Sequence, residues 1–205
     1  LVPRFYDATE GEVKINGRNV KEYNIESLRN HVAVVMQKAL LFKGSIRDNM
    51  KWGKKDATDD EIMEALDISQ SREFVEKKDG KLDAFIDQGG KNLSGGQRQR
   101  LAIARAIVRR PKIYLFDDSF SALDYRTDQQ LRKALKEITG DATVIIVAQR
   151  ISTIREADQI LVMEKGCLIE SGTHDELLKK DGKYAQMWSS YTESINWKIG
   201  TGKAV

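Results

Sequence analysis

The chain has 205 residues, of which 40% are hydrophobic and 32% are charged, and its formal net charge is +3. This length suffices for one sizeable core or two small lobes, and the interspersed charges form no basic stripe of the kind that binds nucleic acid. The longest apolar stretches, such as Ala142–Ala148, fall well short of the ~20 residues that a membrane-spanning helix needs. A single cysteine, Cys167, excludes an internal disulfide framework and a cysteine-based zinc site, and it fits a reducing compartment.

The N-terminal part predicts a hairpin followed by a buried strand. Asn16-Gly17 lies between Glu12–Ile15 and Arg18–Val20, and this dipeptide favours the type I′ turn that joins two twisted strands. His31–Met36 is a short apolar run that ends at Gln37, as expected of a strand buried in a sheet.

The middle of the chain, from Gly44 to Arg110, has a helical pattern. Asp59–Leu66 combines an acidic first turn with apolar residues at helical spacing. The strongest predicted helix runs from Gly95 to Arg109 and is ended by Pro111. We therefore expect this segment to form a second, helical lobe.

After Pro111 the pattern alternates between strands and helices. Continuous apolar strands between helices imply a mostly parallel sheet covered on both faces, so the predicted fold class is α/β. The tail Tyr191–Val205 shows little periodicity and is expected to be loose. The predicted elements are strands at Ile113–Phe116 and Thr143–Val147, helices at Arg126–Ile138 and Ile151–Glu156, a hairpin at Gln159–Glu170, and a helix opened by the capping box Thr173–Glu176.

The segment Leu93–Gln97, LSGGQ, opens the strongest helix. Two adjacent glycines let a ligand approach the backbone closely, and free N–H groups at a helix start attract anions. Ser94 can also serve as an N-cap, with Gln97 completing a capping box. The segment alone is therefore compatible both with an anion site and with a well-capped helix that has no ligand.

Two adjacent carboxylates, Asp117 and Asp118, follow the predicted strand Ile113–Phe116. Ligands of open α/β sheets bind at the carboxyl ends of the strands. Paired acids at this place would repel each other unless a divalent cation or a shared proton intervenes. Capping of the next turn, Ser119–Ala122, would explain one of the two aspartates but not both.

Taken together, these segments resemble the ATP-binding cassette of ABC transporters, with motifs in the family's order from about Tyr6 to Tyr184. LSGGQ followed by Arg98-Gln99-Arg100 matches the signature motif, and Ser121–Asp124 matches the D-loop. Asp117 matches the Walker B aspartate that holds Mg²⁺, and Gln37 matches the Q-loop glutamine. The resemblance thus implies ATP contacts at Ser94, Gly95, Gly96, Gln97 and Asp124, Mg²⁺ contacts at Gln37 and Asp117, and catalytic positions at Asp118 and Gln149.

The resemblance also implies an architecture: a P-loop NTPase-like, mostly parallel sheet flanked by helices, with an N-terminal β-hairpin portion and an inserted helical subdomain. The ATP-binding domain would span residues 1–190, with its α/β core at 1–43 and 111–190, the helical subdomain with the signature motif at 44–110, and the tail at 191–205. Two such cassettes pair head to tail around two ATP molecules, so the signature of one chain contacts the γ-phosphate held by the other. The partners implied are a second cassette and the transmembrane domains of an exporter, at the cytoplasmic face of the cell membrane.

One family element is absent from the sequence. The phosphate loop G-x-x-x-x-G-K-S/T occurs nowhere, and Gly200–Lys203 does not qualify because it is followed by Ala204 and lacks the earlier glycine. Because the chain also does not begin with Met, we expect it to be a piece of a longer protein that starts within the helix after this loop.

Two site positions depart from the family pattern. Asp118 stands where the family usually has the glutamate that polarises the attacking water, and aspartate is one methylene shorter. Gln149 replaces the switch histidine and cannot become cationic near pH 7. Both changes weaken the same site while the signature motif is intact, which resembles the degenerate half of heterodimeric ABC exporters. We therefore expect a chain whose own ATP is hydrolysed slowly and whose signature completes an active site on a different chain.

Two alternative functions are also compatible with the sequence. One is an ATP-responsive regulatory module that binds nucleotide without hydrolysing it. The other is a soluble ABC ATPase that acts on ribosomes or DNA. The low net charge and the lack of coiled-coil heptads disfavour the second alternative.

Overall fold

A computed structural model describes the backbone of residues 1–200 and the side chains of residues 1–193. The chain divides into two compact units, Leu1–Val147 and Ala148–Val205, each with its own core.

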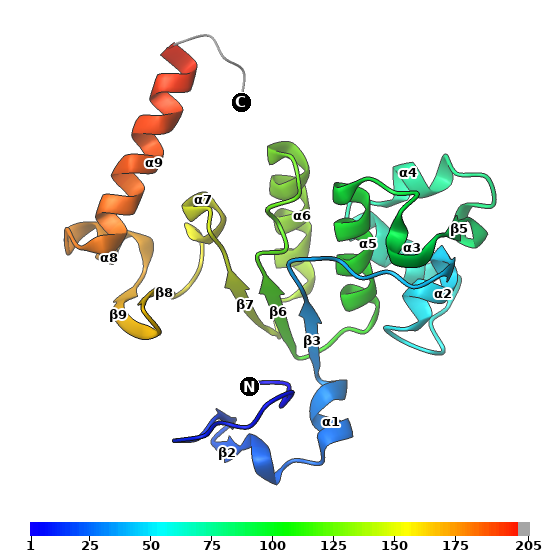
Figure 1. The fold of residues 1–205 in the computed structure, drawn as a ribbon, viewed down its shortest axis with the longest axis horizontal. Helices are drawn as coiled ribbons and strands as arrows, with labels where there is room; N and C mark the ends of the chain where they lie inside the picture. Colours follow the sequence, from blue (N-terminus) through cyan, green and yellow to red (C-terminus); the bar gives the residue numbers. More distant parts are fainter. Residues whose placement is uncertain (201–205) are drawn as a thin grey trace. The chain divides into compact units, whose positions relative to one another are not determined.

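The centre of the first unit is a parallel sheet of three strands in the order β3-β6-β7, namely β3 (Val32–Val35), β6 (Ile113–Asp117) and β7 (Thr143–Val147) (Figure 1). Val35 pairs with Phe116, and Asp117 pairs with Val147. The carboxyl ends of all three strands therefore meet at one edge. The predicted α/β class and the three predicted strands are confirmed.

Side chains alternate between two cores on either face of this sheet. Ala33 and Val35 of β3 belong to the larger core with the helices, whereas Val32 and Val34 belong to a smaller core with the N-terminal segment. This two-sided burial explains why β3 and β6 are apolar throughout rather than alternating. The expected cover on both faces does not extend to β7, where Val144, Ile145 and Val147 are exposed.

The helices of the first unit carry the larger core. Leu101 and Ile103 of α5, like Ile62 and Leu66 of α3, are fully buried in this core. The helices are α1 (Ile25–Asn30), α2 (Ile46–Lys51), α3 (Asp59–Ile68), α4 (Arg72–Glu76), α5 (Gly95–Val108) and α6 (Tyr125–Ile138), with short 3₁₀ turns at Val20–Glu22, Lys81–Asp83 and Gln88–Gly90. The segment expected to be helical also contains a two-stranded pair, β4 (Gly44–Ser45) with β5 (Phe85–Ile86).

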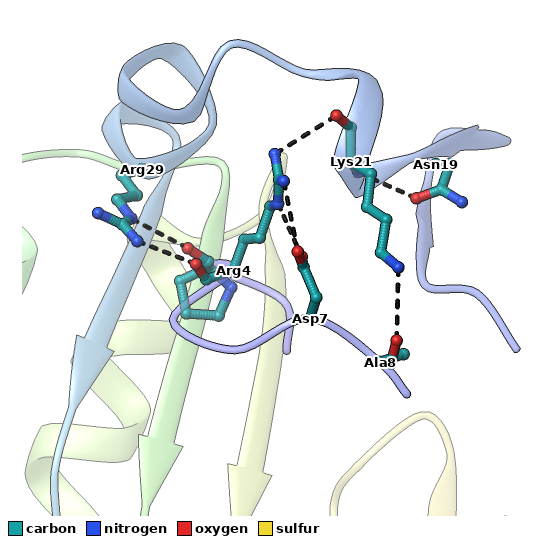
Figure 2. A network of polar contacts seen from close by, with 7 residues as sticks. Arg4, Asp7, Ala8, Asn19, Lys21 and Arg29 are labelled. Carbon is teal, nitrogen blue, oxygen red and sulfur yellow. Dashed lines mark hydrogen bonds and ion pairs between the residues drawn. The ribbon is translucent and has the colours of Figure 1, made fainter. Parts of the chain in front are cut away.

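The N-terminal segment contains the predicted hairpin, β1 (Lys14–Ile15) and β2 (Arg18–Asn19). Asn16 and Gly17 both have positive φ, 49° and 76°, as a type I′ turn requires. Figure 2 shows how the first residues are held: Arg29 of α1 donates hydrogen bonds to the backbone oxygens of Pro3 and Arg4, at 3.1 and 2.9 Å. The Arg4 guanidinium in turn contacts Asp7 and the backbone oxygen of Lys21.

The second unit contains α7 (Ile151–Ile154), the hairpin β8 (Ile160–Glu164) and β9 (Cys167–Gly172), α8 (His174–Lys179) and α9 (Lys183–Gly200). Leu177 and Tyr184 are buried at its centre. The predicted capping box at Thr173 and Glu176 is present.

The expectation of a loose segment from Tyr191 is wrong as far as Gly200, because α9 continues through it. Tyr184, Trp188 and Tyr191 follow one another at helical spacing, and the last two pack against the buried Tyr184 core. This apolar stripe is narrow and lies among polar residues, so the sequence pattern does not indicate a helix here. Residues 201–205 of the expected tail lie outside the described residues.

Candidate functional site

The N-terminus of α5 is the first part of the candidate site. The Ser94 hydroxyl accepts a hydrogen bond from the Gln97 backbone N–H at 3.2 Å, and the Gln97 side-chain oxygen accepts one from the Ser94 N–H at 3.0 Å. This reciprocal pair is the predicted capping box. Gly95 and Gly96 occupy the first turn, where backbone N–H groups have no partner within the helix. Ser94 and Gly95 are exposed, so this turn is presented to solvent.

Gly96 lies close to the loop that precedes α6. A Cβ at this position would lie 3.4 Å from the backbone oxygen of Ala122 and 3.9 Å from Leu123. At Gly95 it would meet only Arg98, at 3.9 Å. The two glycines therefore differ: Gly96 packs beside the Ser121–Asp124 segment, whereas Gly95 is open.

The carboxyl end of β6 is the second part of the site. Asp117 is exposed at the strand end, while Asp118 is 9% exposed and has a φ of 45°, in the left-handed region. The Asp118 backbone N–H donates to Val147 of β7 at 2.8 Å. The Gln37 side-chain amide donates to a carboxylate oxygen of Asp118 at 3.0 Å. The structure therefore brings Gln37 and Asp118 together, 81 residues apart in sequence.

Two further side chains, not predicted from the sequence, fix this end of the sheet. Ser119 is fully buried, and its hydroxyl donates to the backbone oxygen of Val35 at 2.7 Å. The Gln99 side chain of α5 donates to the backbone oxygen of Met36 at 3.1 Å. The end of β3, which leads into Gln37, is thus bound both to the loop after β6 and to the signature helix.

Asp124 is the N-cap of α6. Its carboxylate accepts a hydrogen bond from the backbone N–H of Thr127 at 3.0 Å. This hydrogen bond holds the pKa of Asp124 below its ordinary value, and the charge of Arg100 acts in the same direction. The side chain is therefore ionised near neutral pH, and its carboxylate is engaged in capping α6.

A comparison with known families gives a match to the model described as ABC transporter over residues 1–121, more than half of the chain. The chain belongs to the ABC transporter family. It is 45% identical, over 98% of its length, to an uncharacterized ABC transporter ATP-binding protein of Mycobacterium bovis, and 41% identical, over 91%, to ABC transporter B family member 21 of Arabidopsis thaliana. It covers 34% and 14% of these two relatives, so it spans about a third or less of their length.

Among solved structures, the chain is similar to a bacterial Atm1-family ABC exporter with ATP bound, at 37% identity and a TM-score of 0.89. The match covers 92% of this chain and 33% of the exporter chain. Among the described residues of this ABC transporter chain, none of the helices has the length and apolar character to cross a membrane.

The residues at the end of the ABC sheet fit a magnesium ion. Mg²⁺ is usually held by one or two protein oxygens together with phosphate and water oxygens. Asp117 offers an exposed carboxylate, and Gln37, whose amide nitrogen faces Asp118, has its carbonyl oxygen left for a cation. Within the described residues, no three acidic, histidine or cysteine side chains gather as a metal cluster of their own.

Gln149, the remaining predicted site residue, belongs to the second unit. It is exposed in the segment between β7 and α7. Asp118 belongs to the first unit, and the role of Gln149 stays a prediction from the sequence.

Proposed function

We propose that this chain is the nucleotide-binding domain of an ABC exporter, and that its signature segment completes the active site of a second, different cassette. The observation that carries the proposal is the start of α5. Its cap is fully formed, Ser94 and Gly95 are exposed, and the first-turn N–H groups point out of the helix. Such donors stabilise the charge that develops on a transferring phosphoryl group.

The chain's own site is proposed to bind ATP and to hydrolyse it slowly. The sequence contains no G-x-x-x-x-G-K-S/T loop and spans about a third of the solved exporter chain, so the proposed phosphate loop lies outside these 205 residues. Asp118 has a shorter side chain than glutamate, and the Gln37 amide already donates to it. A misplaced base forfeits much of the roughly 10²–10⁴-fold that general-base assistance supplies.

Mg²⁺ would be held at Asp117 and the Gln37 carbonyl, where it would neutralise charge on the phosphates. The Asp118–Val147 and Ser119–Val35 hydrogen bonds keep the adjoining loop in one position. As the ionised N-cap of α6, Asp124 would help to orient the interface between the two cassettes.

The proposed transmembrane partner would dock on an exposed apolar surface made by Leu40, Phe42 and Trp52. Leu40 and Trp52 are 59% and 68% exposed, and the Phe42 and Trp52 rings lie 4.9 Å apart. Arg105 supports this surface from α5: its guanidinium lies over the Phe42 ring and donates to the Leu40 backbone oxygen at 2.8 Å. A docked membrane domain would place the chain at the cytoplasmic face of the membrane.

A second candidate function is favoured by Asp118 and Gln149, which are both departures from the hydrolytic pattern. In that case the chain would be an ATP-responsive clamp that occludes nucleotide and rarely hydrolyses it. Persistent occlusion of ATP at this chain's site, with no turnover there, would distinguish the clamp from a slow ATPase.

The proposal is tested by placing a carboxylate at the start of α5 in the intact transporter. Gly96→Asp would repel the partner's phosphates, and we expect ATP turnover at the partner's site to fall at least about 100-fold, as on loss of an oxyanion donor. Gly140→Asp is the matched control, because a Cβ at Gly140 meets nothing within 4 Å. Unchanged turnover in the Gly96→Asp transporter would contradict the proposed role of the signature.

A further inference from the structure

A cavity of about 470 Å³ opens in the first unit at the start of β6, between the ends of α3, α5 and α6. This volume lies in the range of pockets that hold small molecules. Ala65 and Ile68 of α3, Ile107 of α5 and Ala142 before β7 contribute apolar walls.

One polar group that faces this cavity has no hydrogen-bond partner among the described residues. Tyr114 of β6 lines it, is 2% exposed and stacks its ring on Phe116 at 5.9 Å. Its hydroxyl makes no hydrogen bond to any residue that the structure describes. Burial raises the pKa of the Tyr114 phenol, so the group is neutral and can donate a hydrogen bond at pH 7. The hydroxyl is not among the fully buried unpartnered atoms, so it reaches the cavity and is available to a ligand with a hydrogen-bonding group.

The charged side chains around the cavity leave an excess of negative charge. Glu64 pairs with Arg110 at 2.6 Å and Glu61 with Lys54 at 2.5 Å, so these two carboxylates are neutralised. Glu137, Asp141 and Lys112 also line the cavity, and none of the three has an ion pair within the described part of the chain. Two carboxylates against one ammonium favour a cationic ligand.

We propose that this cavity binds a small monocationic amphiphile, with its apolar body against Ala65, Ile68 and Ile107, a polar group on the Tyr114 hydroxyl and its cation at Glu137 and Asp141. The site is separate from the candidate nucleotide site. Tyr114 lies near the amino end of β6 and Asp117 at its carboxyl end, about 10 Å apart at 3.3 Å per residue. The proposal therefore does not depend on the proposed function.

The experiment is a fluorescence titration of the chain with dansylcadaverine, which combines an aromatic body, a hydrogen-bonding sulfonamide and a primary amine. We expect saturable binding. Tyr114→Phe should weaken it about fivefold, as the loss of one hydrogen bond does. Glu137→Gln combined with Asp141→Asn should weaken it by a similar factor and remove its salt dependence. Ala142→Leu, which fills the cavity, should abolish it.

Tyr23→Phe is the matched control, because the Tyr23 hydroxyl donates to the Ile15 backbone oxygen away from the cavity, at 2.9 Å. This variant should bind the probe as the unchanged chain does. Absence of saturable binding by the unchanged chain would overturn the proposal. Equal affinity of the unchanged chain and the Tyr114→Phe chain would overturn it as well, and this variant retains the ring that packs on Phe116.

Discussion

The Gln37 side chain donates a hydrogen bond to the Asp118 carboxylate at 3.0 Å, across 81 residues of sequence. This contact joins the end of β3 to the loop after β6. It places an amide against the carboxylate that we propose to stand at the position of the family's base. Because Ser119 and Gln99 also bind the end of β3, the pair rests on a rigid edge of the sheet.

Restoring the family's residues at the two positions proposed to be degenerate should accelerate hydrolysis. In the intact transporter, Asp118→Glu combined with Gln149→His would extend the carboxylate by one methylene and add a group that can become cationic. We expect single-turnover hydrolysis at this chain's site to rise at least about tenfold, a small part of what a well-placed base supplies. An unchanged rate would refute the assignment of Asp118 and Gln149 as the cause of slow turnover.

The buried Ser119 hydroxyl should contribute measurably to stability. Ser119→Ala removes its 2.7 Å hydrogen bond to Val35, and we expect the free energy of unfolding to fall by about 1 kcal/mol or more. Ser27→Ala is the control, since Ser27 is exposed on α1 and surface changes of this kind stay within about 0.5 kcal/mol. Urea unfolding measures both. Equal midpoints for the two variants would show that the Ser119 hydrogen bond adds nothing.

Ser94 is expected to have two separable effects. Ser94→Ala removes the N-cap of α5, which typically costs about 1 kcal/mol of stability, and removes a hydroxyl from the proposed phosphate contact. Ser94→Asp keeps a capping side chain but adds a negative charge. We expect thermal unfolding to show a loss only in the alanine variant, and partner-site ATPase assays to show a loss in both. Full ATPase activity in Ser94→Asp would argue that α5 is merely a capped helix.

The lowered pKa of Asp124 predicts that this residue contributes to stability in a way that is lost in acid. Its folded pKa is lowered below the ordinary 3.8 by the Thr127 N–H, so the stability it contributes is present above 3.8 and is lost as the pH falls through the lowered value. Asp124→Asn caps almost equally well without titrating. Urea unfolding between pH 3 and pH 6 should show the unchanged chain losing stability relative to Asp124→Asn at the acidic end. Parallel curves for the two chains would contradict this.

The apolar surface at Trp52 should matter for coupling rather than for nucleotide binding. Trp52→Ala removes a side chain that is 68% exposed, and we expect the intact transporter to bind ATP as before while substrate-stimulated ATPase falls several-fold. Tyr6→Ala, which removes an aromatic ring that is 79% exposed elsewhere, should leave both unchanged. Normal stimulation in Trp52→Ala would show that the membrane domain does not dock there.

Local chemistry made much of this fold predictable. The apolar runs of β3, β6 and β7, the Asn16-Gly17 turn and the Ser94–Gln97 capping box each depend on neighbouring residues, and all five are present. The predicted tail fails because the Tyr184–Trp188–Tyr191 stripe of α9 is stabilised by packing on a core made elsewhere in the second unit.

The contacts that shape the candidate site were not predictable in the same way. Ser119 and Val35 lie 84 residues apart, and Gln99 and Met36 lie 63 apart, so no periodicity connects them. A buried hydroxyl after a strand, like a glutamine in a signature helix, can form hydrogen bonds with many different partners. The partner of each is decided only when β3 and β6 pair. The identities of Gln37 and Asp118 were evident from their motifs, whereas their hydrogen bond was not.

The most direct test of this account is a structure of the intact transporter with ATP and Mg²⁺ bound. We predict the Ser94 hydroxyl and the Gly96 N–H within hydrogen-bond distance of the γ-phosphate of an ATP molecule whose phosphate loop belongs to the other cassette. An ATP-loaded complex in which the start of α5 faces away from every terminal phosphate would contradict the central claim.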